Sequence, residues 1–195
     1  NGLSMHVTMA GTGPAVLMMH GFPGLGYSWR HQVRALAEAG YTAIAPDMRG
    51  YGGTDAPTEV EAYGRDRVVS DVLGLLDALG IDRAVVSGHD FGAPLAWDLP
   101  HWAPDRIRGV MAVSVPLRHR SPHRPSKAFA AMAEQHFLHH DYFREPGRAE
   151  AELNPRTEEF LHRLFFALSG GYRYLDVWQH PSHTPDGRRL GYLDV

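Results

Sequence analysis

The stretch Gly88-His89-Asp90-Phe91-Gly92-Ala93 determines the fold prediction for this chain. It follows the apolar run 84–87 and precedes a helix-compatible run, 94–101. A small-x-nucleophile-x-small pattern between a strand and a helix is typical of a nucleophile elbow, a sharp turn that lifts one side chain above the carboxyl edge of a sheet. Gly88 and Gly92 permit such a turn. The side chain that this elbow raises is the carboxylate of Asp90.

A carboxylate at the elbow limits the reactions that such a site could catalyse. Asp has an ordinary pKa of about 3.9, so it is ionised at neutral pH and attacks without the help of a base. Attack on a saturated carbon forms an alkyl ester, which water then hydrolyses with the help of a positioned histidine. The elbow therefore predicts epoxide opening or carbon–halogen cleavage. The alternative is an incidental turn, because Asp and Gly are common in turns.

Two further motifs stand at the ends of predicted strands. His20-Gly21-Phe22-Pro23 follows the apolar run 15–19, and Asp47-Met-Arg-Gly-Tyr-Gly-Gly-Thr-Asp55 follows the run 41–45. The backbone N–H groups of Phe22 and Phe91 are expected to form an oxyanion hole, with the loop shaped by a cis Phe22–Pro23 bond. Three strand-then-loop units predict one site at the carboxyl edge of an open sheet.

Together the three motifs resemble the α/β-hydrolase-fold epoxide hydrolases, from near residue 1 to about residue 175. The resemblance implies an α/β fold: a mostly parallel, doubly wound sheet with a helical cap, of which the carboxyl-terminal strands and helices are missing from this chain. It makes Asp90 the nucleophile and Phe22 and Phe91 the oxyanion-hole donors. It implies a substrate pocket shaped by His20 and Pro23, with Trp29 as a pocket or packing aromatic, packing being favoured.

The same resemblance points to what the chain lacks. In this family a catalytic histidine and its acid partner follow the cap, and none of the 13 histidines stands in that late position. Some relatives carry the acid after the strand here expected at 107–115, where this chain has Ser114. Without later strands, residues 110–113 would form an exposed apolar edge. We therefore expect a complementing carboxyl-terminal part, from the same gene or as a second chain.

Alternating apolar runs set the expected elements and domains. Strands are expected at 3–10, 16–19, 41–45, 84–87 and 107–115, and helices at 27–39, 67–79 and 93–101. These place the amino-terminal core at 1–115, a Pro-rich hinge linker at 116–126 and a partial helical cap at 127–195. In the cap, Asn154 and Pro155 are expected to begin a helix that Gly170-Gly171 ends.

The cap is also expected to supply an acid for the alkoxide that epoxide opening leaves. The segment Tyr142 to Gly147 resembles the lid of mammalian soluble epoxide hydrolase, and that alignment puts the first acid tyrosine on His139. His136, His140 and Tyr142 are neighbouring alternatives, as is a surface histidine cluster. The second acid tyrosine would lie beyond Val195, with Tyr172, Tyr174 and Tyr192 as late candidates in weak context. Phe22, Phe91, Trp29, Phe137 and Tyr142 are expected around an apolar pocket.

The composition limits which classes of protein and which partners are possible. The chain has 195 residues, 44% hydrophobic residues, no cysteine and a net charge of −3, which argues against a nucleic-acid surface and excludes disulfides. No apolar run reaches the roughly 18 residues of a membrane span, and the start is no secretory signal. We expect a bacterial, cytoplasmic enzyme that needs no cofactor and no metal. Its expected partners are a small apolar epoxide and water, and a homodimer is left open.

Three functions remain. Epoxide hydrolysis is favoured over haloalkane or haloacid dehalogenation, which uses the same elbow and ester. Phe91 stands where a fluoroacetate-type dehalogenase would want Arg and a haloalkane dehalogenase Trp, and Phe22 stands where the latter would have Asn. The third alternative is a non-catalytic fragment that needs a complementing chain.

Overall fold

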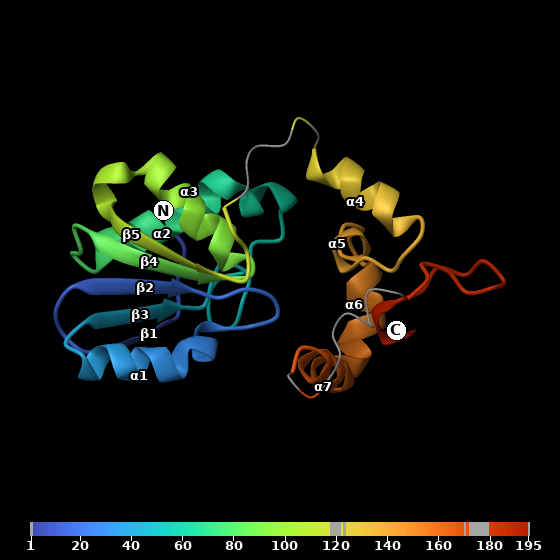
Figure 1. Cartoon of the computed structure of the whole chain (residues 1–195), viewed down its shortest axis with the longest axis horizontal. Coiled ribbons are helices and arrows are strands. Elements are labelled where there is room, and N and C mark those ends of the chain that lie inside the picture. Colours follow the sequence, from blue (N-terminus) through green and yellow to red (C-terminus); the bar gives the residue numbers. More distant parts are fainter. Residues whose placement is uncertain (1, 118–121, 123, 170, 172–179, 195) are drawn as a thin grey trace. The chain divides into compact units, whose positions relative to one another are not determined.

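A computed structural model describes residues 2–117, 122, 124–169, 171 and 180–194 of the chain. The chain divides into two compact units, Asn1–Arg118 and His119–Val195 (Figure 1). This division falls inside the predicted linker 116–126, part of which lies outside the described residues.

The first unit is built on a five-stranded sheet in the order β1-β3-β2-β4-β5. Its strands are β1 (Val7–Ala10), β2 (Ala15–Met19), β3 (Thr42–Pro46), β4 (Ala84–His89) and β5 (Ile107–Val113). β1 runs antiparallel to β3, and the other three pairings are parallel. The sheet is therefore mostly parallel, as the alternation of apolar runs predicts.

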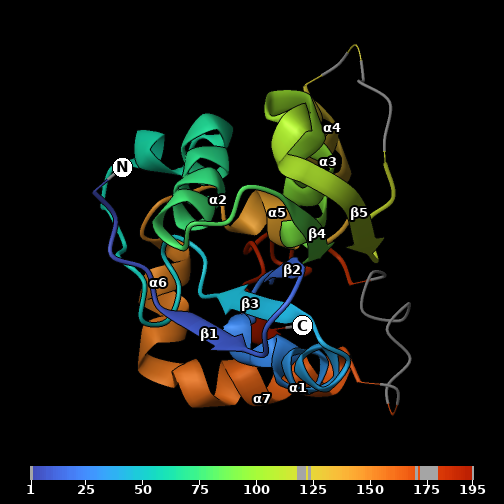
Figure 2. The same cartoon turned by 90° about the vertical axis from the view of Figure 1, so that its left-hand side faces the viewer.

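Helices cover both faces of this sheet. The longer helices of the first unit are α1 (Arg30–Glu38), α2 (Arg65–Ala78) and α3 (Gly92–Trp102). Its 3-10 turns are η1 (Gly26–Trp29), η2 (Val60–Tyr63) and η3 (Pro104–Arg106). Figure 2 shows α1 on one face and α2 with α3 on the other. Successive β2 side chains alternate between the faces: Val16 and Met18 pack in the α1 cluster, whereas Leu17 and Met19 pack in the α2–α3 cluster. Burial on both faces explains why this strand is apolar throughout.

Two strands are shorter than expected, each for a local reason. Residues 3–6 do not join β1, because their backbone pairs with the loop after β3: Ser4 with Asp55, and His6 with Thr54 and Asp47. β5 ends at Val113, since Ser114 adopts the left-handed conformation with φ of 68°. The helix expected at 27–39 begins as the 3-10 turn η1 and becomes α-helical from Arg30.

The last strand, β5, is an edge of the sheet in the described part of the chain. It pairs with β4 on one side, and the side chains of Met111 and Val113 remain 53% and 41% exposed. An apolar strand edge of this kind is a ready template for another strand.

The second unit is helical. It contains α4 (Pro125–Ala133), α5 (His139–Tyr142), α6 (Arg148–Leu153), η4 (Asn154–Arg156), α7 (Thr157–Ala167) and η5 (Tyr192–Asp194). An isolated β-bridge between His136 and Pro181 joins the segment after residue 180 to the rest of this unit. A second bridge, between His183 and Arg189, lies within that segment. None of the helices within the described ranges is long and apolar enough to cross a membrane.

The helix expected from Asn154 begins later than predicted. Asn154 and Pro155 form a 3-10 turn, and α7 starts at Thr157, with Glu158 and Glu159 in its first turn where carboxylates suit the helix dipole. α7 ends at Ala167, before Gly170, which lies outside the described residues. The expected capping by Asn154 is therefore wrong, because the chain makes one tighter turn before the helix.

Candidate active site

Asp90 lies at the turn between β4 and α3 in the left-handed conformation, with φ of 52°. Two glycines make this turn sterically possible. A Cβ atom on Gly88 would lie 2.0 Å from the carbonyl oxygen of Gly92, and one on Gly92 would lie 2.3 Å from that of Met19. A strained non-glycine residue held between obligatory glycines is the geometry of a nucleophile elbow.

The loop after β2 reaches the Asp90 side chain. The backbone N–H of Phe22 donates a hydrogen bond to Oδ1 of Asp90 over 3.0 Å. Gly21 packs against the same side chain, since a Cβ atom there would lie 2.3 Å from the Cβ of Asp90. The Phe22–Pro23 bond is cis, as the sequence suggests. The structure thus brings together Asp90, Phe22 and Pro23.

Phe91, the second expected oxyanion donor, is the N-cap residue of α3. Backbone N–H groups at the start of a helix point toward the positive end of the helix dipole, which favours negative charge. Phe91 is 58% exposed on the first unit and follows Asp90 directly in the chain. The donor role of Phe91 stays a prediction.

His20 holds backbone groups inside the protein. The side chain is 3% exposed, Nδ1 contacts the carbonyl oxygen of Gly21 at 2.9 Å, and Nε2 accepts a hydrogen bond from the N–H of Met48 at 2.9 Å. Burial is the largest cause that lowers the pKa of His20, which favours the neutral ring. Both ring nitrogens are occupied, so the expected substrate contact of His20 is corrected to a structural one.

Asp47 organises the loop after β3, a role that the sequence reasoning missed. Its Oδ1 accepts the N–H of Gly26 at 2.8 Å, and its Oδ2 accepts the N–H of Gly53 at 3.1 Å and faces Nδ1 of His6 at 3.0 Å. The Asp47 side chain is buried, and buried carboxylates need such partners. A usable signal was present: an acid directly after a buried strand and before a glycine-rich loop.

The same loop carries Arg49 and Tyr51. Arg49 makes a two-pronged ion pair with Asp71 of α2, at 2.7 Å and 2.6 Å, and the Asp71 side chain is fully buried. Tyr51 meets the His20 ring edge-on at a centroid distance of 4.9 Å. Burial and the negative charge of Asp90 raise the pKa of Tyr51 to about 12, so its hydroxyl stays protonated at neutral pH.

Trp29 lies in the core. It is 7% exposed and belongs to the α1 cluster with Val16, Met18 and Val33. The pocket-wall assignment of Trp29 is therefore corrected to the packing role that the sequence already favoured.

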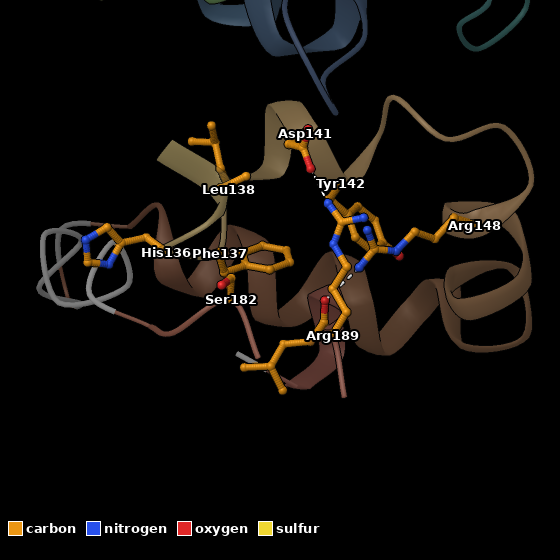
Figure 3. Close-up of a pocket in the computed structure, with 10 residues that line it drawn as sticks. His136, Phe137, Leu138, Asp141, Tyr142, Arg148, Ser182 and Arg189 are labelled. Atoms are coloured by element: carbon orange, nitrogen blue, oxygen red, sulfur yellow. Dashed lines mark hydrogen bonds and ion pairs between the residues drawn. The ribbon is translucent and has the colours of Figure 1, made fainter. Parts of the chain in front are cut away.

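Tyr142 is a core residue of the second unit. It is 1% exposed, and its hydroxyl donates to Oε2 of Glu152 at 2.8 Å. The Arg148 guanidinium lies over its ring, 4.6 Å from the centroid, as Figure 3 shows. A buried ring with an occupied hydroxyl packs the interior of this unit, so the expected substrate contact of Tyr142 is corrected to packing.

Phe137 packs in the same core of the second unit. Its ring lies 5.7 Å from that of Tyr142 and 5.5 Å from that of Tyr192, measured between centroids. Tyr192, a late candidate for the second acid, also contacts Phe160, whereas Tyr172 and Tyr174 lie outside the described residues. These aromatic contacts join α5, α7 and η5.

A small pocket of about 10 Å³ adjoins Tyr142, with room for one water molecule. Its polar lining includes Asp141, Arg148, Ser182 and Arg189, and Arg189 pairs with Asp141 (Figure 3). This pocket lies wholly within the second unit and is too small for an organic substrate.

His139, the expected lid acid, is the first residue of α5 and is half-buried. Its ring contacts that of His140 at 4.0 Å between centroids, and His140 stacks on Phe129 at 4.6 Å. The acid role of His139 stays a prediction.

The α/β hydrolase fold family matches residues 14–186, which include strands β2 to β5, the elbow and most of the second unit. The chain belongs to the α/β-hydrolase-fold family.

Several members of this family are similar to the chain in sequence. Epoxide hydrolase A of Mycobacterium tuberculosis (strain ATCC 25618 / H37Rv) is 45% identical over 170 residues, which cover 86% of this chain and 53% of that protein. Epoxide hydrolase 2 of Siraitia grosvenorii is 47% identical over 169 residues, again covering 86% and 53%.

A solved α/β-hydrolase structure is also similar. The crystal structure of epoxide hydrolase A from Mycobacterium thermoresistibile matches with a TM-score of 0.88 and 41% identity, over 99% of this chain and 60% of that one. This α/β-hydrolase-fold chain therefore spans about half the length of the curated relatives it matches.

Proposed function

We propose that this chain is the amino-terminal part of an epoxide hydrolase, which opens a small apolar epoxide to a vicinal diol. The observation that carries the proposal is the Asp90 carboxylate, raised on the elbow and held by the N–H of Phe22 at 3.0 Å. The names of the relatives support the same substrate class. Haloalkane or haloacid dehalogenation remains the alternative reaction for an Asp elbow.

The chemistry proceeds in two steps. In the first, a carboxylate oxygen of Asp90 attacks an epoxide carbon, the ring C–O bond breaks, and the alkoxide takes a proton from a lid acid. In the second, water attacks the ester carbonyl carbon, the tetrahedral oxyanion receives hydrogen bonds from the N–H groups of Phe22 and Phe91, and the diol leaves. The second step returns Asp90 to its carboxylate form.

His139 is the proposed lid acid of the first step. A protonated imidazole can donate to the new alkoxide and recover its proton from water. We assign His139 this role rather than Tyr142, because the Tyr142 hydroxyl already donates to Glu152.

The general base for the second step and its acid partner are proposed to lie in a complementing carboxyl-terminal part. Two observations support this: β5 ends the sheet with Met111 and Val113 exposed, and the relatives are about twice as long as the aligned region. We propose that a further strand pairs with β5. In the same scheme, residues 1–115 form the core, 116–126 a hinge and 127–195 part of the cap.

A turnover assay tests the proposal. Styrene oxide and a short haloalkane are given to the chain alone and to the chain with a complementing part. Diol formation that needs the complementing part and is lost in Asp90→Asn supports epoxide hydrolysis. Halide release without diol would favour dehalogenation, and neither product would favour a non-catalytic fragment.

A further inference from the structure

The peptide unit between Gly21 and Phe22 is held at both of its ends. Its carbonyl oxygen accepts a hydrogen bond from the N–H of Gly24 at 2.8 Å and contacts Nδ1 of His20 at 2.9 Å. Its N–H donates to Asp90 at 3.0 Å. This peptide is trans, since the cis bond is the next one, so its C=O and N–H point in opposite directions. Fixing the carbonyl oxygen therefore aims the N–H.

The contacts of the His20 ring select one tautomer. The N–H of Met48 donates to Nε2 at 2.9 Å, so Nε2 carries no hydrogen. Nδ1 must then carry the hydrogen, which it donates to the Gly21 carbonyl oxygen. The result is a chain of hydrogen bonds with one direction: Met48 N–H to His20, His20 to Gly21, and Phe22 N–H to Asp90.

We propose that His20 is a positioning residue for the nucleophile, which acts through the Nδ1–H tautomer to aim the Phe22 N–H at Asp90. The inference rests on the proposed function, in which Asp90 is the reacting group. Each donor in the chain polarises the next, so the Phe22 N–H becomes a better donor to the carboxylate and later to the oxyanion.

Neighbouring contacts hold the chain of hydrogen bonds in place. Asp47, next to Met48, accepts a hydrogen bond from the N–H of Gly26 at 2.8 Å. Two consecutive residues after β3 therefore hold the loop after β2 at both of its ends, His20 and Gly26. Tyr51 closes over the edge of the His20 ring. Burial favours the neutral ring by lowering its pKa, which keeps Nε2 free to accept.

Two variants of His20 separate the two ends of the ring. In His20→Asn, the side-chain amide lies near the place of Nδ1 and can still donate to the Gly21 carbonyl, but Met48 loses its acceptor. In His20→Gln, the amide oxygen reaches the place of Nε2 and can accept from Met48, but the donor to Gly21 is lost. Each variant removes one hydrogen bond and leaves one buried backbone group unpaired, so the two variants should lose similar amounts of stability.

The kinetic readout is the rate at which excess styrene oxide alkylates Asp90, measured by intact mass. The Phe22 N–H fixes one carboxylate oxygen of Asp90 and thereby orients the other. Because a misplacement of about 1 Å at a reacting group can cost about 100-fold in rate, a misaimed donor should lower the alkylation rate about ten-fold or more in His20→Gln. His20→Asn should lose less than about three-fold. Equal losses in both variants, or a greater loss in His20→Asn, would overturn the proposal.

The spectroscopic readout does not depend on epoxide chemistry. Long-range ¹H–¹⁵N spectra of the His20 ring should show the Nδ1–H tautomer, and the Phe22 amide proton should move upfield in His20→Gln but much less in His20→Asn. An Nε2–H tautomer, or a Phe22 amide unmoved in His20→Gln, would overturn the positioning role. If the parent chain is never alkylated, the proposed function fails, while these spectra still decide what His20 does.

Discussion

The N–H of Phe22 and the carboxylate of Asp90 meet at 3.0 Å although they are 68 residues apart in the chain. The sheet order explains the meeting. β2 and β4 are parallel neighbours, so the loops that follow them emerge side by side at the same edge. The contact fixes one carboxylate oxygen, and in the proposed reaction the other one attacks the epoxide.

Gly21→Ala should disable the nucleophile. The new Cβ would lie 2.3 Å from the Cβ of Asp90, and either the loop or the elbow must move. We expect alkylation of Asp90 by styrene oxide to slow at least ten-fold, with a loss of about 1–3 kcal/mol in unfolding free energy. Gly74→Ala in α2 is the matched control, since its Cβ would meet nothing within 4 Å. That variant should be stabilised by about 0.5–1 kcal/mol and react normally. Normal alkylation in Gly21→Ala would contradict the packing described here.

Arg49→Ala should destabilise the first unit strongly. It leaves the fully buried Asp71 carboxylate without its ion-pair partner, which costs about 3–5 kcal/mol for buried pairs. Urea unfolding measures the change. Arg34→Ala removes the exposed pair with Glu38 and should cost less than about 1 kcal/mol. Similar losses in the two variants would show that burial does not set the strength of the Arg49–Asp71 pair.

Tyr142 should make the stability of the second unit sensitive to alkaline pH. Burial, and then the hydrogen bond to Glu152, raise the pKa of Tyr142 above its ordinary value of 10. The unfolded chain therefore loses this proton at a lower pH than the folded one, so the stabilisation is complete below pH 10 and is lost as the pH rises above it. Thermal unfolding followed across this range should show the decline.

Tyr142→Phe should remove that alkaline contribution. It should also cost about 2 kcal/mol at neutral pH, because Glu152 loses a hydrogen-bond donor. Tyr27→Phe, at an exposed tyrosine, is the control and should change neither quantity. An alkaline decline of the same size in Tyr142→Phe would assign the effect to another group.

The order of strands and helices along the chain could be predicted from the sequence. Apolar runs that end at Gly or Pro predict the strands of the sheet, and the spacing of Gly88, Asp90 and Gly92 predicts the elbow with its nucleophile. These features are visible because the residues that cause them are adjacent in the chain. Boundaries were less predictable, because Ser4 and His6 pair with a distant loop and Ser114 turns left-handed after β5.

The contacts that individual side chains make in the folded protein could not be predicted from the sequence. His20 looks like a pocket residue until the structure shows its two nitrogens on Gly21 and Met48. The place of Asp47 after a buried strand signals a structural role, but it does not identify the three groups that surround the carboxylate. Tyr142 lies in a motif that suggests a lid acid, yet packing buries it. In each case the three-dimensional neighbours, which the sequence does not specify locally, decide the role.

The central claim is that Asp90 is a nucleophile for epoxides. The most direct test is denatured intact-mass spectrometry after brief exposure to styrene oxide, followed by peptide mapping. The account predicts a mass increase of one epoxide, located on Asp90 and absent from Asp90→Asn. An adduct on another residue, or one that persists in Asp90→Asn, would contradict it.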